Sequence, residues 1–158
     1  MTFESLMNRA YGGITVVIGG LYYATPSWMK RKWSDAGLPL GSNVKFIAHS
    51  DSLEPLKSKH NISKIMGFSK GGQTIWREIE MNPDEYDFIG LIDPTTSRTF
   101  YELPENVYSL TNSNNWGAYP RIQTHMRNME RSGILTRTNL PHERIPLEFF
   151  KRYESELA

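Results

Sequence analysis

Residues 65–72, IMGFSKGG, join a short apolar run at 62–66 to an amphipathic stretch at 71–81. The apolar run predicts a buried strand, and the stretch after it predicts a helix that stops at Pro83. A Gly-x-Ser-x-Gly pattern is common by chance. A strand directly before it and a helix directly after it, however, are the context in which a serine occupies a tight strand-to-helix turn. The segment therefore predicts such a turn, with Ser69 at the carboxyl edge of a sheet.

The rest of the chain repeats this alternation of short apolar runs and helix-length spacers, which is typical of βαβ units and a parallel sheet. We therefore predict an α/β fold: one domain over residues 1–158, built as a three-layer αβα sandwich with a mostly parallel sheet of about six strands. The predicted strands are residues 14–18, 44–48, 62–66, 88–92 and 107–110, with a weaker one at 133–136, and the predicted helices are 27–36, 71–81, 119–131 and 147–157.

The composition is that of an ordinary globular protein, with 39% hydrophobic and 22% charged residues among 158. A net charge of +1 gives no global field toward nucleic acid or an anionic membrane, so neither is an expected partner. The absence of cysteine excludes disulfides and thiolate catalysis and suits a reducing compartment. Residues 1–13 lack the apolar segment of a signal peptide, and we expect a cytoplasmic protein.

The turn around Ser69 carries the chemistry that the sequence suggests. Small residues at Gly67 and Gly71 would let the backbone adopt a strained turn without side-chain collisions. The hydroxyl would then stand at the amino end of a helix, where the amide of Lys70 faces a developing oxyanion. The Lys70 side chain cannot readily turn onto its neighbour to act as the base. The plainer alternative is an ordinary turn in which Ser69 caps the helix.

In the order of these motifs the chain resembles the α/β-hydrolase superfamily, in a trimmed version without a lid. The strand at 14–18 and the glycines after it look like the strand and loop that supply the second oxyanion donor. The resemblance implies that the amide of Gly20 or Leu21 fills this role. Ile18 stands where the superfamily usually has a histidine. Strands that precede the first one in the full fold have no room before Ile14.

A serine nucleophile needs a base, for which histidine is the usual residue. His142 follows the last predicted strand and precedes the final predicted helix, which is where the superfamily places its catalytic histidine. His49, at the end of the 44–48 strand, is the second choice. His125 is predicted to be a packing or surface residue on a helix, and His60 an exposed loop residue.

The third member of the triad stays open between two residues, or is absent. The superfamily usually has an acid after the strand at 107–110, where this chain offers asparagines, among them Asn115, and no carboxylate. Asp93, before Pro94, resembles the acid of the pancreatic-type lipases, and its plainer role is a turn cap. Asp51 and Glu143 are weaker substitutes.

These features lead to a serine hydrolase that cleaves an ester or thioester through an acyl-enzyme on Ser69. No cofactor is implied, and no third ligand joins His49 and Asp51 to make a metal site. A lidless site favours a small or polymer-attached ester. The alternative is a binding or structural protein that retains the scaffold without turnover.

Overall fold

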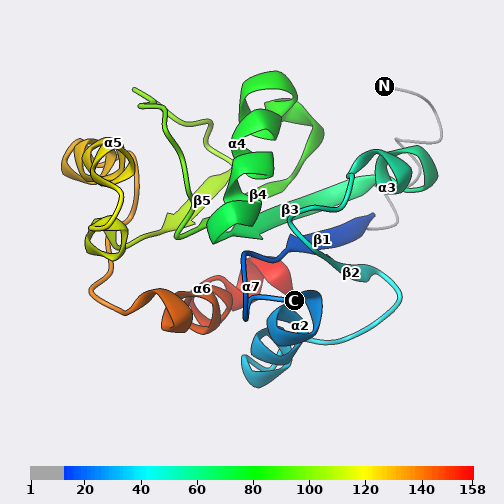
Figure 1. The fold of residues 1–158 in the computed structure, drawn as a ribbon. Helices are drawn as coiled ribbons and strands as arrows, with labels where there is room; N and C mark the ends of the chain where they lie inside the picture. The colour runs from blue at the N-terminus through cyan, green and yellow to red at the C-terminus, as the bar shows by residue number, and fades with distance from the viewer. Residues whose placement is uncertain (1–12) are drawn as a thin grey trace.

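Five parallel strands form one sheet in the order β2-β1-β3-β4-β5 in the computed structural model, which describes residues 13–158 (Figure 1). Every connection between neighbouring strands is a crossover, so the protein belongs to the α/β class. The strands are β1 (Ile14–Ile18), β2 (Val44–Ile47), β3 (Ile62–Phe68), β4 (Phe88–Ile92) and β5 (Val107–Leu110).

Helices lie on both faces of this sheet, and the strand residues alternate between them (Figure 1). In β1, Val16 packs into the cluster that contains α4 (Gly72–Met81), whereas its neighbour Val17 packs into the cluster beneath α2 (Pro26–Asp35) and α6 (Ile145–Arg152). Both valines are fully buried. Covered on its two faces, the sheet can be built from nearly continuous apolar strands, which explains why short apolar runs locate it.

Three further helices complete the described chain. Helix α5 (Pro120–Arg131) buries two methionines in the cluster on the α4 side of the sheet. Helix α3 (Glu54–Lys59) precedes β3, and α7 (Glu154–Leu157) follows α6 after a break at Tyr153. None of the helices in residues 13–158 combines the length and apolar character that crossing a bilayer requires.

The strand order creates one position at which ligands commonly bind. From β1 the chain crosses outward to β2 and then returns to β3 on the other side of β1. The loops after β1 and β3 therefore leave neighbouring strands toward opposite faces, the arrangement in which open α/β sheets commonly bind ligands at the carboxyl ends of their strands. Gly20 follows β1 and Ser69 follows β3, so both stand at this switch point.

The weak strand predicted at residues 133–136 does not form. The amides of Ile134 and Leu135 both donate to the carbonyl of Met129, so this segment closes the end of α5 instead of extending the sheet. Only an isolated parallel bridge, between Thr111 and Arg137, continues the sheet beyond β5. The described sheet therefore has five strands rather than about six.

Two helices differ from expectation for local reasons. The sequence predicted no helix at α3, which has six residues, a proline in its first turn and no buried side chain, so it lacks an apolar stripe. The single helix predicted at 147–157 begins earlier, at Ile145, and is interrupted at Tyr153. The Tyr153 backbone, at φ −108° and ψ 24°, is outside the helical range.

A cluster of charged and polar side chains joins α3 and the segment after α4 to the α4 helix. Glu78, only 9% exposed, accepts hydrogen bonds from Lys57 Nζ at 2.8 Å, Tyr86 Oη at 2.7 Å and Asn82 Nδ2 at 3.2 Å. Burial alone would raise the pKa of this carboxyl, but the hydrogen bonds from Lys57, Tyr86 and Asn82 outweigh it and lower that pKa. Burial also raises the pKa of Tyr86, and the carboxylate of Glu78 raises it further.

Replacing Glu78 with Gln should therefore destabilise the fold in a pH-dependent way. Because the folded pKa lies below the unfolded one, the stabilisation is complete above about pH 4.3 and disappears as the pH falls through the folded value. We expect the free energy of unfolding to drop by about 1–3 kcal/mol at pH 7. Urea denaturation at pH 7 and pH 3 should show the difference from the native protein shrinking at the lower pH.

Glu80→Gln on the same helix is the matched control. Glu80 pairs with Arg98, whose side chain is 69% exposed, so we expect a change of less than about 1 kcal/mol. Equal losses for the two variants, or a Glu78→Gln effect that does not depend on pH, would contradict this account.

Candidate active site

Three non-glycine residues with positive φ lie just beyond the carboxyl ends of three adjacent strands. Tyr22, at φ 56°, lies in the loop after β1, Ser69, at φ 56°, directly follows β3, and Asp93, at φ 38°, directly follows β4. Within residues 13–158 no other residue except glycine has a positive φ. Such conformations cost roughly 1–3 kcal/mol each and cluster at functional sites, so this edge of the sheet is the candidate site.

The turn that carries Ser69 depends on close backbone approaches that only glycine permits. Ser69–Gly71 forms a single 3-10 turn, η1, between β3 and α4. A Cβ atom on Gly71 would lie 2.4 Å from the carbonyl oxygen of Gly19, and one on Gly20 would lie 3.0 Å from Cβ of Ser69. The glycine loop after β1 therefore packs directly against the serine turn.

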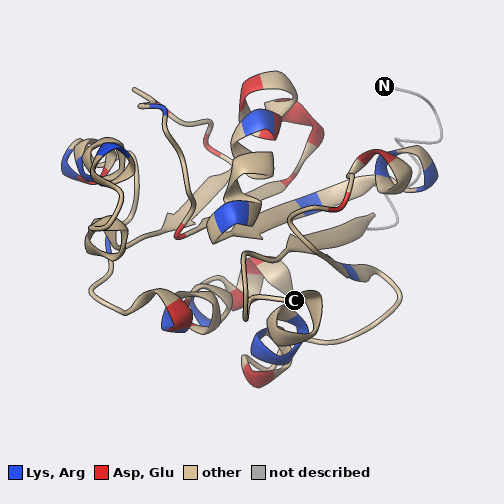
Figure 2. Ribbon diagram, in the orientation of Figure 1, with Lys and Arg blue, Asp and Glu red and all other residues tan. Residues whose placement is uncertain are grey.

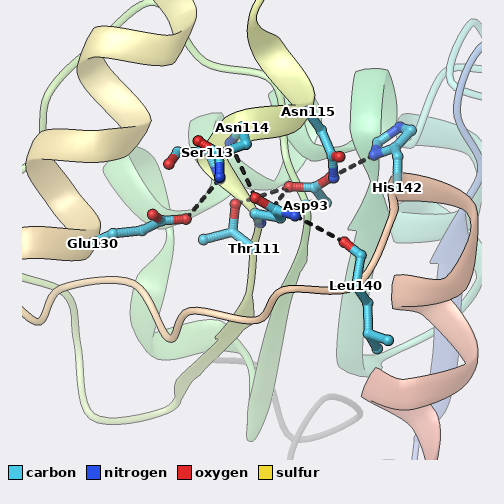
Figure 3. Close-up of polar contacts among 9 residues, drawn as sticks. Asp93, Thr111, Ser113, Asn114, Asn115, Glu130, Leu140 and His142 are labelled. Carbon is cyan, nitrogen blue, oxygen red and sulfur yellow. Dashed lines mark hydrogen bonds and ion pairs between the residues drawn. The ribbon is translucent and has the colours of Figure 1, made fainter.

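Asp93 is fully buried and receives hydrogen bonds from four donors (Figure 3). Its Oδ1 accepts from Thr111 Oγ1 at 2.9 Å and from the amide of Asn112 at 3.0 Å. Its Oδ2 accepts from Asn115 Nδ2 at 2.8 Å and from His142 Nδ1 at 2.5 Å. A buried carboxyl group is tolerated only with such partners, and the four donors fix its orientation.

His142 begins the 3-10 turn η4 (His142–Arg144), and contacts on several sides set its ring orientation. The ring stacks on Phe68, with centroids 4.5 Å apart, and meets the edge of Trp116 at 5.2 Å. Because Asp93 can only accept, Nδ1 of the neutral ring carries the hydrogen, and Nε2 presents a lone pair. With 24% of its side chain exposed, His142 remains accessible to a substrate or water.

Ser69 is close to this pair without being bonded to it. Phe68, on which the histidine ring stacks, is the residue before Ser69. Among the described residues the Ser69 hydroxyl has no hydrogen bond to His142, and its backbone carbonyl accepts from the amide of Thr95 at 2.9 Å. In free enzymes the nucleophile and its base are often separated until a substrate binds, so this geometry is compatible with a catalytic role.

The three amides predicted as oxyanion donors differ in whether they are free to bind an oxyanion. The amide of Gly20 donates to the carbonyl of Ala24 at 2.9 Å, closing the loop after β1, and so it is not free to bind an oxyanion. Within residues 13–158 the amides of Leu21 and Lys70 form no backbone hydrogen bond. These two amides remain the candidates, one from each side of the switch point.

The remaining predicted residues are not gathered at the histidine. Asn115 contacts Asp93 rather than the imidazole, so Asp93 is the direct partner of His142. His49 follows the edge strand β2, which β1 separates from β3, and Asp51 accepts from the amide of Ala48 in that same turn. His125 bonds to Thr99, and His60 and Glu143 are exposed.

Aromatic side chains form a row beside the site. Tyr23 meets Trp28 edge-on at 5.1 Å, and Trp28 stacks at 5.8 Å on Phe68, which in turn contacts His142. Burial raises the pKa of Tyr23, and the carboxylates of Glu143 and Asp93 raise it further, which places this phenol near the candidate site. Tyr22, by contrast, is 90% exposed. The row can supply an apolar wall for a bound substrate.

Sequence reasoning missed the residues that hold the acid in place. Thr111 and Asn112 each donate to Asp93 Oδ1, and the Asn112 side chain also donates to the carbonyl of Leu140, just before His142. A run of five polar residues directly after a buried strand, at 111–115, was the available signal. Because the carboxyl ends of parallel strands share one edge, these residues had to lie near Asp93.

Gly71→Ala should weaken the fold because the added methyl meets rigid backbone. The new Cβ would lie 2.4 Å from the oxygen of Gly19 and 2.8 Å from that of Ile18. We expect a loss of about 1–3 kcal/mol in the free energy of unfolding, measured by urea denaturation. Gly117 has nearly the same dihedral angles, φ −58° against −62°, but its nearest neighbour would be 3.7 Å away. Gly117→Ala should therefore be neutral or stabilising, and equal losses would refute the steric explanation.

Comparison of the chain with models of known protein families, with curated proteins and with solved structures finds no match. The geometry of this chain therefore provides the grounds for a function. Three features carry it: the strained serine turn at the switch point, the buried Asp93, and the histidine held by that acid.

Proposed function

We propose that this protein is a serine hydrolase that cleaves an ester or thioester through an acyl-enzyme on Ser69. The observation that carries the proposal is the hydrogen bond between buried Asp93 and His142 Nδ1, beside a serine held at φ 56°. A serine on a strained turn, a histidine and an orienting acid are the arrangement that activates a hydroxyl for acyl transfer. We also propose that the fold is a three-layer αβα sandwich of the trimmed α/β-hydrolase type.

The proposed reaction begins with attack of Ser69 Oγ on the carbonyl carbon, while His142 Nε2 takes the hydroxyl proton. The amides of Lys70 and Leu21 stabilise the oxyanion, and the tetrahedral intermediate collapses as the imidazolium protonates the leaving oxygen or sulfur. Water then attacks the acyl-enzyme, giving a proton to His142 that returns to Ser69 as the acid product leaves. Asp93 orients the ring and stabilises its positive charge throughout, and no cofactor takes part.

The strand order alone does not distinguish the trimmed α/β-hydrolase fold from other doubly wound folds, because the flavodoxin-like fold has the same order. The discriminating features are the non-glycine residue of positive φ after β3 and the acid–histidine pair. A small-molecule or polymer-attached ester is the proposed substrate, with the row of aromatic side chains beside His142 as its wall. The cysteine-free composition fits a cytoplasmic location.

Two observations favour the alternative, a binding or structural protein on the same scaffold. The Ser69 hydroxyl is not hydrogen-bonded to His142 among the described residues, and Gly20, one of the expected oxyanion donors, is occupied. A catalytic role requires the Ser69–His142 bond to form when substrate enters. Labelling of the serine by a reactive probe tests this directly.

A fluorophosphonate probe should label the native protein at Ser69, with loss of fluoride. We expect no labelling of Ser69→Ala, and a labelling rate lower by roughly 10²–10⁴-fold in His142→Ala, which lacks the general base. His60→Ala, which removes an exposed histidine away from the site, is the matched control and should label like the native protein. The rates are followed by mass spectrometry on protein whose cooperative thermal unfolding shows that it is folded.

Two outcomes would oppose the proposal. Folded native protein that takes up no probe would support the non-catalytic scaffold. Labelling that persists in Ser69→Ala, or that falls equally in His60→Ala and His142→Ala, would assign the reactivity to another group. A labelled serine would next be tested with simple aryl esters and thioesters to separate the two substrate classes.

A further inference from the structure

A second candidate site lies on the other side of the η3 turn (Ser113–Trp116) from His142. While Asn115 and Trp116 of this turn contact Asp93 and His142, the first two residues of the turn line a cavity of about 250 Å³. The cavity is bounded by η3, by helix α5 and by the segment after α5 that contains Arg137. Its lining residues are Ser113, Asn114, Arg127, Glu130, Arg131 and Arg137.

Three arginines from two parts of the chain converge on this cavity. Arg127 and Arg131 are four residues apart on α5 and so lie on the same side of that helix, whose basic residues are visible in Figure 2. Arg137 comes from the segment that forms the bridge with Thr111. Each guanidinium keeps its charge at any physiological pH.

In residues 13–158 these three arginines form no ion pair, unlike Arg98 and Arg152, which face Glu80 and Glu148. The one carboxylate of the cavity, Glu130, forms no ion pair with them: its Oε1 accepts from the amide of Ser113 at 2.9 Å (Figure 3). Three guanidinium groups and one carboxylate leave an excess of two positive charges around the cavity. The positive charges of the arginines repel one another, and a bound anion would reduce this repulsion.

We infer that this cavity binds a phosphate monoester. Such a group carries about −1.5 to −2 charges at neutral pH, which matches the excess around the cavity, and its terminal oxygens accept the paired N–H donors of arginine. Ser113 and Asn114, whose side chains carry neutral donors, line the same space. The inference does not depend on the proposed hydrolase activity, since none of the lining residues belongs to the Ser69–His142–Asp93 group.

The inference is tested by titrating the ¹⁵N-labelled full chain with adenosine monophosphate and, separately, with inorganic phosphate at constant ionic strength. We expect saturable shifts of the Ser113 and Asn114 amide signals in NMR spectra. The double variant Arg131→Gln/Arg137→Gln should bind at least tenfold more weakly. Arg121→Gln, which removes the same charge from α5 outside the cavity, should stay within twofold of the native affinity. Arg127 is left unchanged because it is partly buried.

The two ligands distinguish the sources of the phosphate group. Binding of adenosine monophosphate at least tenfold tighter than inorganic phosphate would indicate an ester of a larger molecule, and comparable affinities would indicate free phosphate. Acetate at the same ionic strength should give no saturable shift. The inference is overturned if acetate reproduces the shifts, if Arg121→Gln weakens binding as much as the double variant does, or if neither phosphate ligand saturates the folded native protein.

Discussion

The burial of the Asp93 carboxylate is the constraint on which the carboxyl edge of this protein depends. A charge removed from water must be compensated by hydrogen bonds, and here three donors come from the segment 111–115 and the fourth is His142. Losing one donor would leave an ionised oxygen undersolvated, at a cost of roughly 1–3 kcal/mol. The carboxylate therefore holds the loop after β5 and the turn at His142 in one arrangement.

Glycine at four close approaches allows the other half of the edge to form. A Cβ on Gly19, Gly67, Gly71 or Gly72 would lie within 2.4 Å of another atom. For Gly71 that atom is the carbonyl oxygen of Gly19, so the turn after β3 and the loop after β1 come nearer than a side chain permits. This crowding holds Ser69 in its left-handed conformation, because the backbone on both sides has no room to relax. Strain at the serine is thus maintained by packing, while orientation at the histidine is maintained by polar contacts.

Much of the sheet could be predicted from the sequence, because both of its faces are covered and its strands are consequently short apolar runs. The run near Leu135 has the same composition, but the end of α5 takes its amides, a tertiary contact that no local pattern reveals. Helix α3 was missed for the opposite reason: it has no fully buried side chain, and only Leu56 packs partly against the core, beside polar contacts such as the one between Lys57 and Glu78.

The candidate site, like the sheet, could be predicted only in part from the sequence. Ser69 and His142 could be chosen from motif and position, whereas the choice between Asp93 and Asn115 depended on which side chain reaches the imidazole across neighbouring strands. Both residues turned out to belong to one network, with the amide supporting the acid. The arginine cavity shows the same limit, because the spacing of Arg127 and Arg131 is visible in the sequence and the approach of Arg137 is not.

The position of His142 directly before α6 has a consequence for folding. The twelve residues from Ile145 to Glu156, which follow it closely, include Phe149 and Phe150, which are fully buried against the sheet face shared with Trp33. Until this segment packs, that face of the sheet lacks the cover of two phenylalanines, and the turn that begins at His142 lacks the helix that follows it. Closure of the hydrophobic core on this face and placement of His142 beside Asp93 therefore depend on the same short segment of chain.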